Sequence, residues 1–266
     1  MNDGLRDAGY AVLGLAMLSW ILTDRVSHAA RRELKSAFPS ANFDIRITPR
    51  GLLGMTVGQA YRARISGGGF TAESLPFRIE PGGGAVAGIR HLELDLHDIV
   101  LRDLGVQTLT ADIPFVKADA TKAFFDGHLR FRGAQEGTGE AILTAEQIER
   151  YLAKKRPQFQ ELKIRLSQGE AFISGKTALL IPGSAFEAKA TVGISEGRYL
   201  NAENPTVSLN GTPMPRTMAI QLLKTVNPII DIDKDLGLGE WLYITSAEIA
   251  EGKLTVRGRI HIPVKH

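Results

Sequence analysis

The sequence of 266 residues contains no cysteine. This absence excludes a disulfide framework, a zinc site built from thiolates and a cysteine nucleophile. An excess of one charge is also lacking, because 32 basic residues face 29 acidic ones and the formal net charge is only +3. A nucleic-acid-binding protein more often has a clear basic excess or a dense basic stripe, so nucleic acid is not expected as a partner.

Long hydrophobic runs are scarce as well. Residues 8–22 (AGYAVLGLAMLSWIL) form an uncharged segment of 15 residues. As a helix this segment would extend over about 23 Å, less than the ~30 Å hydrocarbon core of a bilayer. Three interpretations remain open: a retained signal anchor, a secretory signal peptide cleaved near residues 27–29 (SHA), and a buried core helix. We divide the chain into residues 1–23, the signal anchor or signal peptide, and residues 24–266, a single domain.

The charges that flank the apolar segment leave its orientation open. Arg25, Arg31, Arg32 and Lys35 follow the segment, whereas Arg6 stands nearly alone before it. The positive-inside rule therefore does not favour export of the remainder.

Alternation of apolar and polar residues dominates the sequence from residue 43 onward. Leucines occupy positions 92, 94 and 96, and the phase then shifts to Ile99 and Leu101, which predicts a β-bulge. Similar alternation occurs over residues 186–194 and over residues 242–262, where Glu251 and Gly252 indicate a hairpin turn. We therefore predict the α+β class, with a long, strongly curved antiparallel β-sheet that has one apolar face.

Helical signals interrupt the strands at three places. Residues 24–37 carry an apolar stripe with spacings of four, four and three. Residues 144–156 open with a capping box and close with Lys154, Lys155 and Arg156 before a proline. Residues 215–226 form another amphipathic segment, which ends at an Asn-Pro pair. These few helices leave much of the apolar sheet face to be buried against something else.

Catalytic and metal-binding motifs are weak. Ser195 lies in a G-x-S-x-G sequence, but the helix that must follow a nucleophile elbow is not predicted. Residues 231–235 (DIDKD) begin like an EF-hand loop and then lack its glycine and its final glutamate. The sequence therefore predicts no catalysis, no metal site and no cofactor. The basic run 154–156 is either a solvated helix end or a site that attracts anionic lipid headgroups.

Several segments resemble the LmeA-like bacterial phospholipid-binding family over most of residues 24–262. They are Arg31 to Leu34 (RREL), residues 143–148 (LTAEQI), residues 173–176 (ISGK), residues 227–238 (NPIIDIDKDLGL) and residues 252–258 (GKLTVRG). The resemblance implies a fold similar to the tubular lipid-binding (TULIP) proteins, with a curved sheet wrapped around one or two helices. It also implies phospholipid binding at a membrane, on the extracytoplasmic side.

We expect a membrane-tethered phospholipid-binding or lipid-transfer protein whose partners are phospholipid and the membrane. Strand and helix parity selects the apolar residues that would line the groove for the acyl chains. They are Leu92, Leu94, Leu96, Phe186, Val192, Ile194, Met218, Leu222, Leu254, Val256 and Ile260. Two alternatives remain: a structural β-scaffold without a ligand, and a serine esterase that uses Ser195.

Overall fold

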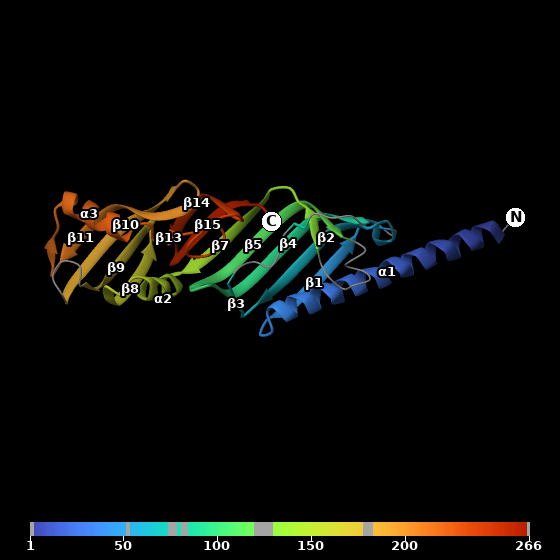
Figure 1. Ribbon diagram of the computed structural model, residues 1–266, viewed down its shortest axis with the longest axis horizontal. Coiled ribbons are helices and arrows are strands. Elements are labelled where there is room, and N and C mark those ends of the chain that lie inside the picture. The colour runs from blue at the N-terminus through green and yellow to red at the C-terminus, as the bar shows by residue number, and fades with distance from the viewer. Residues whose placement is uncertain are drawn as a thin grey trace.

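The computed structural model describes residues 3–51, 54–73, 79–80, 85–119, 130–177 and 183–264. The molecule is elongated, with helix α1 (Asp3–Ala37) at one end and helix α3 (Arg216–Val226) at the other (Figure 1). Two open β-sheets lie between these helices along the long axis. The predicted α+β class, with large, mainly antiparallel sheets and few helices, is confirmed.

The first sheet has nine strands, in the order β1-β2-β4-β5-β7-β15-β14, with β3 beside β4 and β6 beside β5. Its strands are β1 (Asn42–Pro49), β2 (Gln59–Gly68), β3 (Thr71–Ala72), β4 (Val86–Leu101), β5 (Leu104–Asp119), β6 (Phe131–Gly133), β7 (Gly137–Thr144), β14 (Leu242–Ala250) and β15 (Lys253–Ile260). A short 3₁₀ helix, η1 (Gly54–Val57), precedes β2. Strands β2 and β3 pair with β4 in parallel, and the other pairs are antiparallel. The predicted hairpin at Glu251 and Gly252 joins β14 to β15.

The second sheet has six strands, in the order β12-β11-β10-β9-β8, with β13 beside β11. Its strands are β8 (Phe159–Ser167), β9 (Glu170–Thr177), β10 (Ser184–Ser195), β11 (Tyr199–Leu209), β12 (Thr212–Pro213) and β13 (Ile230–Asp231). All of these pairs are antiparallel. This sheet and α3 form the end of the molecule opposite the N-terminus (Figure 1).

The division into two sheets differs from the single long sheet that the alternation predicts. Helix α2 (Ala145–Lys155) separates β7 from β8 in the chain, and β8 to β13 form the second sheet before β14 and β15 return to the first. Isolated backbone hydrogen bonds connect the two sheets: Gly169 N to Ile249 O at 3.1 Å and Gly252 N to Leu166 O at 3.2 Å. Because periodicity identifies strands but not their partners, it does not reveal this break.

Helix α1 joins the predicted apolar segment 8–22 and the predicted amphipathic helix 24–37 into one helix of 35 residues. Its C-terminal part packs against β1, where Ala30 and Leu34 are buried. No helix in the described part of the chain has an apolar stretch long enough to cross a bilayer. The membrane-helix part of the fold prediction is therefore not confirmed.

The inner face of the first sheet is filled by apolar side chains that become small towards the middle of the sheet. Leu94, Ala111, Gly139 and Gly258 are neighbours across β4, β5, β7 and β15. A Cβ atom at Gly139 would lie 2.4 Å from Ile260 Cδ1, closer than real Cβ atoms approach. Glycine at this position therefore leaves room for the Ile260 side chain to cover the inner face.

The predicted bulge near residue 98 is wrong. His97 pairs with Thr108 and Ile99 pairs with Val106, so the register of β4 and β5 continues without an inserted residue. Asp98 instead adopts the left-handed conformation with a φ of 49°. This local backbone change, which Asp tolerates better than most residues, accompanies the change of phase.

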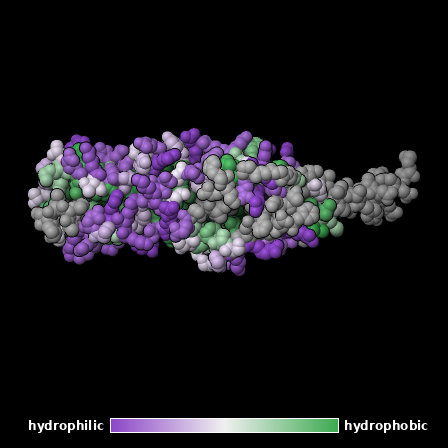
Figure 2. All heavy atoms as spheres, viewed as in Figure 1, coloured by the Kyte–Doolittle hydropathy of each residue, from purple (hydrophilic) through white to green (hydrophobic). Residues whose placement is uncertain are grey.

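In Figure 2, most of the coloured surface between the two ends of the molecule is hydrophilic. On β4 the apolar residues Leu92, Leu94 and Leu96 are buried, while Glu93 and Asp95 between them point to the other face. The strands thus have one apolar and one polar face, as the alternation predicts.

Candidate functional site

The inner face of the second sheet forms an apolar floor. Ile173, Ala188 and Val207 are neighbours across β9, β10 and β11, and Phe186 lies opposite Leu209 in the next row. Each of these side chains belongs to the alternating pattern that places every second residue on this face. Because the side chain of Ala188 is small, it leaves space above the sheet between the larger side chains of Ile173 and Val207.

Helix α2 forms one wall above this floor. The Thr144 hydroxyl accepts a hydrogen bond from Gln147 N at 3.3 Å, and Gln147 Oε1 accepts one from Thr144 N at 2.9 Å. This capping box confirms the predicted start of the helix. Leu152 near the end of α2 and Phe159 at the start of β8 both face the space above the sheet.

Helix α3 forms the opposite wall and packs against β11. Ala219 is buried, with 1% of its surface exposed, while Leu222 and Val226 on the same side are half-buried. The Asn227 side chain fixes the end of the helix, because it donates to Ala202 O and accepts from Ala202 N, both at 2.9 Å. The Asn227 side-chain amide thus bonds the backbone of Ala202 in the way that a neighbouring strand would bond β11.

Between the floor and the two helices lies a cavity with a volume of about 80 Å³. This volume is several times the ~10–15 Å³ that one water molecule needs. The walls are almost entirely hydrocarbon, and the lining residues are Leu152, Arg156, Phe159, Leu162, Ile173, Thr177, Phe186, Ala188, Lys189, Ala190, Ala202, Pro205, Val207, Leu209, Ala219, Leu222, Leu223, Val226 and Ile229. Because apolar cavities exclude water and admit apolar guests, this space is suited to a short segment of a hydrocarbon chain.

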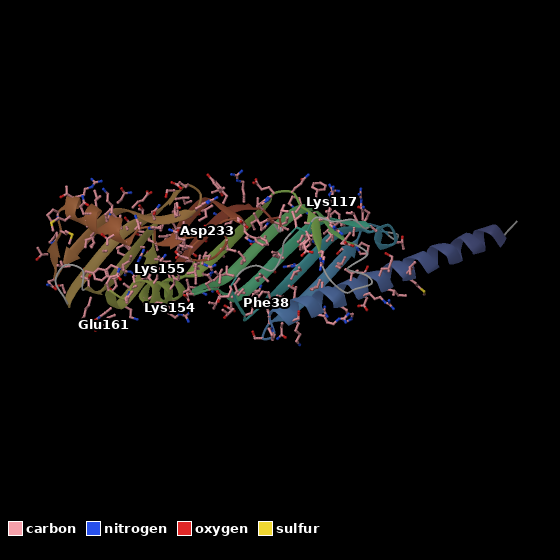
Figure 3. All side chains as sticks on the ribbon, viewed as in Figure 1. Phe38, Lys117, Lys154, Lys155, Glu161 and Asp233 are labelled. Atoms are coloured by element: carbon pink, nitrogen blue, oxygen red, sulfur yellow. The ribbon has the colours of Figure 1, made fainter. Side chains whose placement is uncertain are left out.

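A polar cluster attaches the end of α2 to the loop after α3. Lys155 Nζ donates to Tyr151 Oη at 3.1 Å and forms an ion pair with Asp235. Asp235 also accepts a hydrogen bond from Asp231 N at 2.7 Å. Figure 3 shows Lys155 beside the neighbouring Lys154 at this end of α2.

The two acidic groups of this cluster have shifted pKa values. Burial opposes ionisation of Asp235, but hydrogen bonds from Lys155, the Asp231 backbone and Tyr151 hold its pKa below the usual value. Burial raises the pKa of Tyr151, and the Asp235 carboxylate raises it further. At neutral pH, Asp235 is therefore ionised and Tyr151 is neutral.

The Asp235 carboxylate should make folding sensitive to acid. Its folded-state pKa lies below the usual value of 3.8, so its contribution to stability is present above that pH and is lost as the pH falls through the folded-state pKa. We expect the free energies of unfolding of the wild type and Asp235→Asn to differ at pH 7 and to converge below pH 4, in urea titrations at each pH. The exposed Asp233 is the control, and Asp233→Asn should follow the wild type. If the difference in the free energy of unfolding between Asp235→Asn and the wild type stays constant from pH 7 to below pH 4, the lowered pKa of Asp235 is contradicted.

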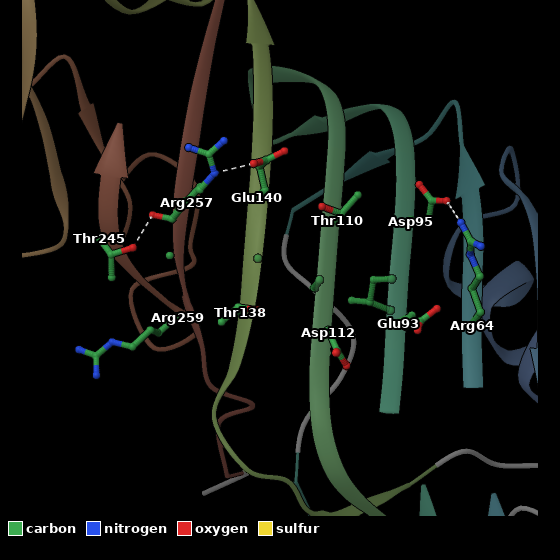
Figure 4. Close-up of a pocket in the computed structure, with 14 residues that line it drawn as sticks. Arg64, Glu93, Asp95, Thr110, Asp112, Thr138, Glu140, Thr245, Arg257 and Arg259 are labelled. Carbon is green, nitrogen blue, oxygen red and sulfur yellow. Dashed lines mark hydrogen bonds and ion pairs between the residues drawn. The ribbon is translucent and has the colours of Figure 1, made fainter. Parts of the chain in front are cut away.

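A second hollow lies on the outer face of the first sheet and has a volume of about 600 Å³ (Figure 4). Its charged side chains neutralise one another: Arg257 Nε lies 2.7 Å from Glu140 Oε2, and Arg64 forms an ion pair with Asp95. A surface of paired charges is well solvated by water and offers little to a hydrocarbon chain. The apolar cavity of the second sheet is therefore the stronger candidate site.

A comparison with known protein families assigns the chain to one of them. A family model described as LmeA-like phospholipid-binding matches residues 14–259. The chain belongs to this family. Comparisons with curated proteins and with solved structures gave no significant match.

In this LmeA-like protein, the residues predicted to contact lipid are divided among different environments. Phe186 and Leu222 line the apolar cavity. Five residues lie in the buried core of the first sheet, each with 2–6% of its surface exposed: Leu92, Leu94, Leu96, Leu254 and Val256. Val192, Ile194 and Ile260 are partly buried against the core, and Met218 on α3 is 50% exposed. That any of these eleven residues contacts lipid stays a prediction.

The two weak motifs, at Ser195 and at residues 231–235, take part in local hydrogen bonds in the LmeA-like chain. Ser195 ends β10 and accepts a hydrogen bond from Asn201 Nδ2 at 2.7 Å, and a turn and then β11 follow it in place of the helix of a nucleophile elbow. Asp231 Oδ1 accepts hydrogen bonds from Asp233 N and Lys234 N, both at 3.1 Å, and so shapes the loop itself. Among the described residues, no cluster of three His, Asp or Glu side chains is arranged to hold a metal ion.

Several cavity residues were not predicted from the sequence. Ala188, Ala202 and Ala219 are small and carry no functional signal of their own, although Ala188 belongs to the alternating run in β10. In the sequence, Arg156 stands with Lys154 and Lys155 in a basic run that is either a solvated helix end or a site for anionic headgroups, and nothing there places it at a cavity. A search for small apolar residues on the predicted inner face could have identified the alanines.

Proposed function

We propose that this LmeA-like protein binds a phospholipid by holding an acyl chain in the cavity between the second sheet, α2 and α3. The observation that carries the proposal is the almost purely hydrocarbon lining of this cavity in a member of a phospholipid-binding family. Burial of a methylene group stabilises a bound chain by about 0.8 kcal/mol, so an apolar space of suitable shape is sufficient for binding. The role needs no catalytic group, and we propose a binding or carrier protein without enzymatic activity.

We further propose that the protein works at a membrane on the extracytoplasmic side, with its N-terminal region as the tether. Exposed apolar side chains on α1 support membrane contact, since Met17 is 67% exposed and Leu18 and Ile21 are each 45% exposed. Met218 and Ile220 on α3 are also exposed, at 50% and 38%, next to the cavity. Exposed apolar residues in such groups are typical of surfaces that meet lipid or protein.

Lipid extraction tests the proposed function. We expect the full-length protein, purified with detergent and then washed free of it, to release phospholipid into organic solvent, detected by mass spectrometry. The same protein should take up a phospholipid with a fluorescent acyl chain from vesicles. A protein that carries no phospholipid and takes none up would contradict the proposal and favour the β-scaffold. Ester hydrolysis that Ser195→Ala abolishes would instead support the esterase.

A further inference from the structure

Three cations end helix α2, and carboxylates neutralise only two of them. Lys154 forms an ion pair with Asp103, and Lys155 forms one with Asp235. Arg156 has no carboxylate partner in the described ranges. Its Nη2 atom donates instead to two backbone carbonyl oxygens, Val226 O at 2.9 Å and Pro228 O at 3.3 Å. The guanidinium charge is therefore balanced only by dipoles.

Arg156 also keeps an unused hydrogen-bond donor. Its Nε atom is buried and has no hydrogen-bond partner within the part of the chain that the structure describes. Buried N–H groups are almost always paired, because leaving one unsatisfied is costly. An unpaired donor on a cation is a position where an anion would be stabilised.

The position of Arg156 connects this donor to the apolar cavity. Arg156 is one of the residues that line the cavity, and it is half-buried, so it lies where the cavity meets the surface. Lys189 lines the same cavity, but its Nζ atom lies 2.8 Å from Glu170 Oε2 and its charge is neutralised. Of the two cations in the described lining, only Arg156 is without a carboxylate.

We propose that Arg156 binds the phosphate group of a phospholipid whose acyl chain occupies the cavity. This inference rests on the proposed function and adds a determinant of headgroup recognition to it. Nη2 is already engaged by Val226 O and Pro228 O, so the Nε–H group is the donor offered to a phosphate oxygen, and the charge of the guanidinium complements the charge of the phosphate. An apolar cavity with such a cation at its boundary selects phospholipids over uncharged lipids that carry the same chains.

A purely structural role of Arg156 makes a different prediction. Arginine near the C-terminus of a helix can stabilise the last carbonyl groups, and Val226 ends α3. If this were its only role, loss of Arg156 would loosen α3 and weaken the binding of every lipid equally. The two roles therefore differ in whether the loss depends on the phosphate.

The test compares two probes that share their acyl chains. Full-length protein is titrated with phosphatidylglycerol and with diacylglycerol, each carrying one identical fluorescent acyl chain. We expect Arg156→Gln to weaken the binding of phosphatidylglycerol about tenfold or more, and to leave the binding of diacylglycerol within about twofold of the wild type. Lys154→Gln, at the same helix end, is the matched control and should change neither affinity.

Arg156→Lys keeps the charge but removes the Nε–H donor, so we expect an intermediate loss of affinity for phosphatidylglycerol alone. This variant also provides the comparison if Arg156→Gln does not fold. Equal weakening of both probes, or an unchanged affinity for phosphatidylglycerol, would overturn the role of Arg156 while leaving the proposed function intact. Failure of the wild type to bind either probe would overturn both.

Discussion

Replacing Ala188 with phenylalanine should strongly weaken acyl-chain binding while the protein remains folded. Ala188 lies on the cavity floor between Ile173 and Val207, so a ring at this position fills the space above the sheet. A ring that displaces about three methylene groups would remove about 2.4 kcal/mol of binding free energy, at about 0.8 kcal/mol for each group. The dissociation constant should then rise about fiftyfold, as measured by titration with a fluorescent phospholipid.

The same strand offers a matched control. Ala185 also lies on β10, but it is exposed and does not line the cavity, so Ala185→Phe adds the same ring without filling the site. We expect this variant to bind phospholipid like the wild type. Adding a larger side chain to a packed core typically costs about 1–3 kcal/mol of folding stability. The melting temperature of each variant is therefore measured together with its affinity. Wild-type affinity in a folded Ala188→Phe variant would place the acyl chain elsewhere, despite the apolar lining of this cavity.

Local features of the fold followed from the sequence because short-range physics determines them. The capping box at Thr144 and Gln147 fixed the start of α2, and the turn at Glu251 and Gly252 joined two alternating strands. The Asn227–Pro228 pair ended α3 as expected, since proline does not continue a helix. Each of these signals lies within a few residues of the structure that it specifies.

The location of the candidate cavity depends on long-range packing and was therefore not predictable from periodicity. Leu92 and Ala188 both occupy apolar positions in alternating strands, yet Leu92 is buried in the core and Ala188 lines a cavity. Among the described residues, the inward side chains of the first sheet join the buried core, whereas α2 and α3 border a cavity over the second sheet. Alternation reports that a residue faces inward, but not what fills the space that it faces.

A buried ion pair holds the first sheet together near one end of its longest hairpin. Asp119, at the end of β5, is only 1% exposed and contacts the guanidinium of Arg132 on β6, which is 12% exposed. The backbone N–H of Asp119 also donates to Arg130 O at 2.9 Å. Next to this pair, Phe131 is almost completely buried. The ion pair therefore fixes β6 to β5 at a point where the core has little tolerance for a change of position.

Replacing Asp119 with alanine should be severely destabilising, because it leaves the Arg132 charge buried without this carboxylate. Removal of one partner from a buried ion pair typically costs about 3–5 kcal/mol. We expect a loss of this size in the free energy of unfolding, measured by urea denaturation. Asp103→Ala removes an ion pair whose carboxylate and ammonium side chains are 50% and 69% exposed, and water screens such pairs strongly, so this control should change stability little. A similar small change in both variants would mean that water reaches the Arg132 guanidinium once the carboxylate is gone, and that β6 is held mainly by its apolar contacts.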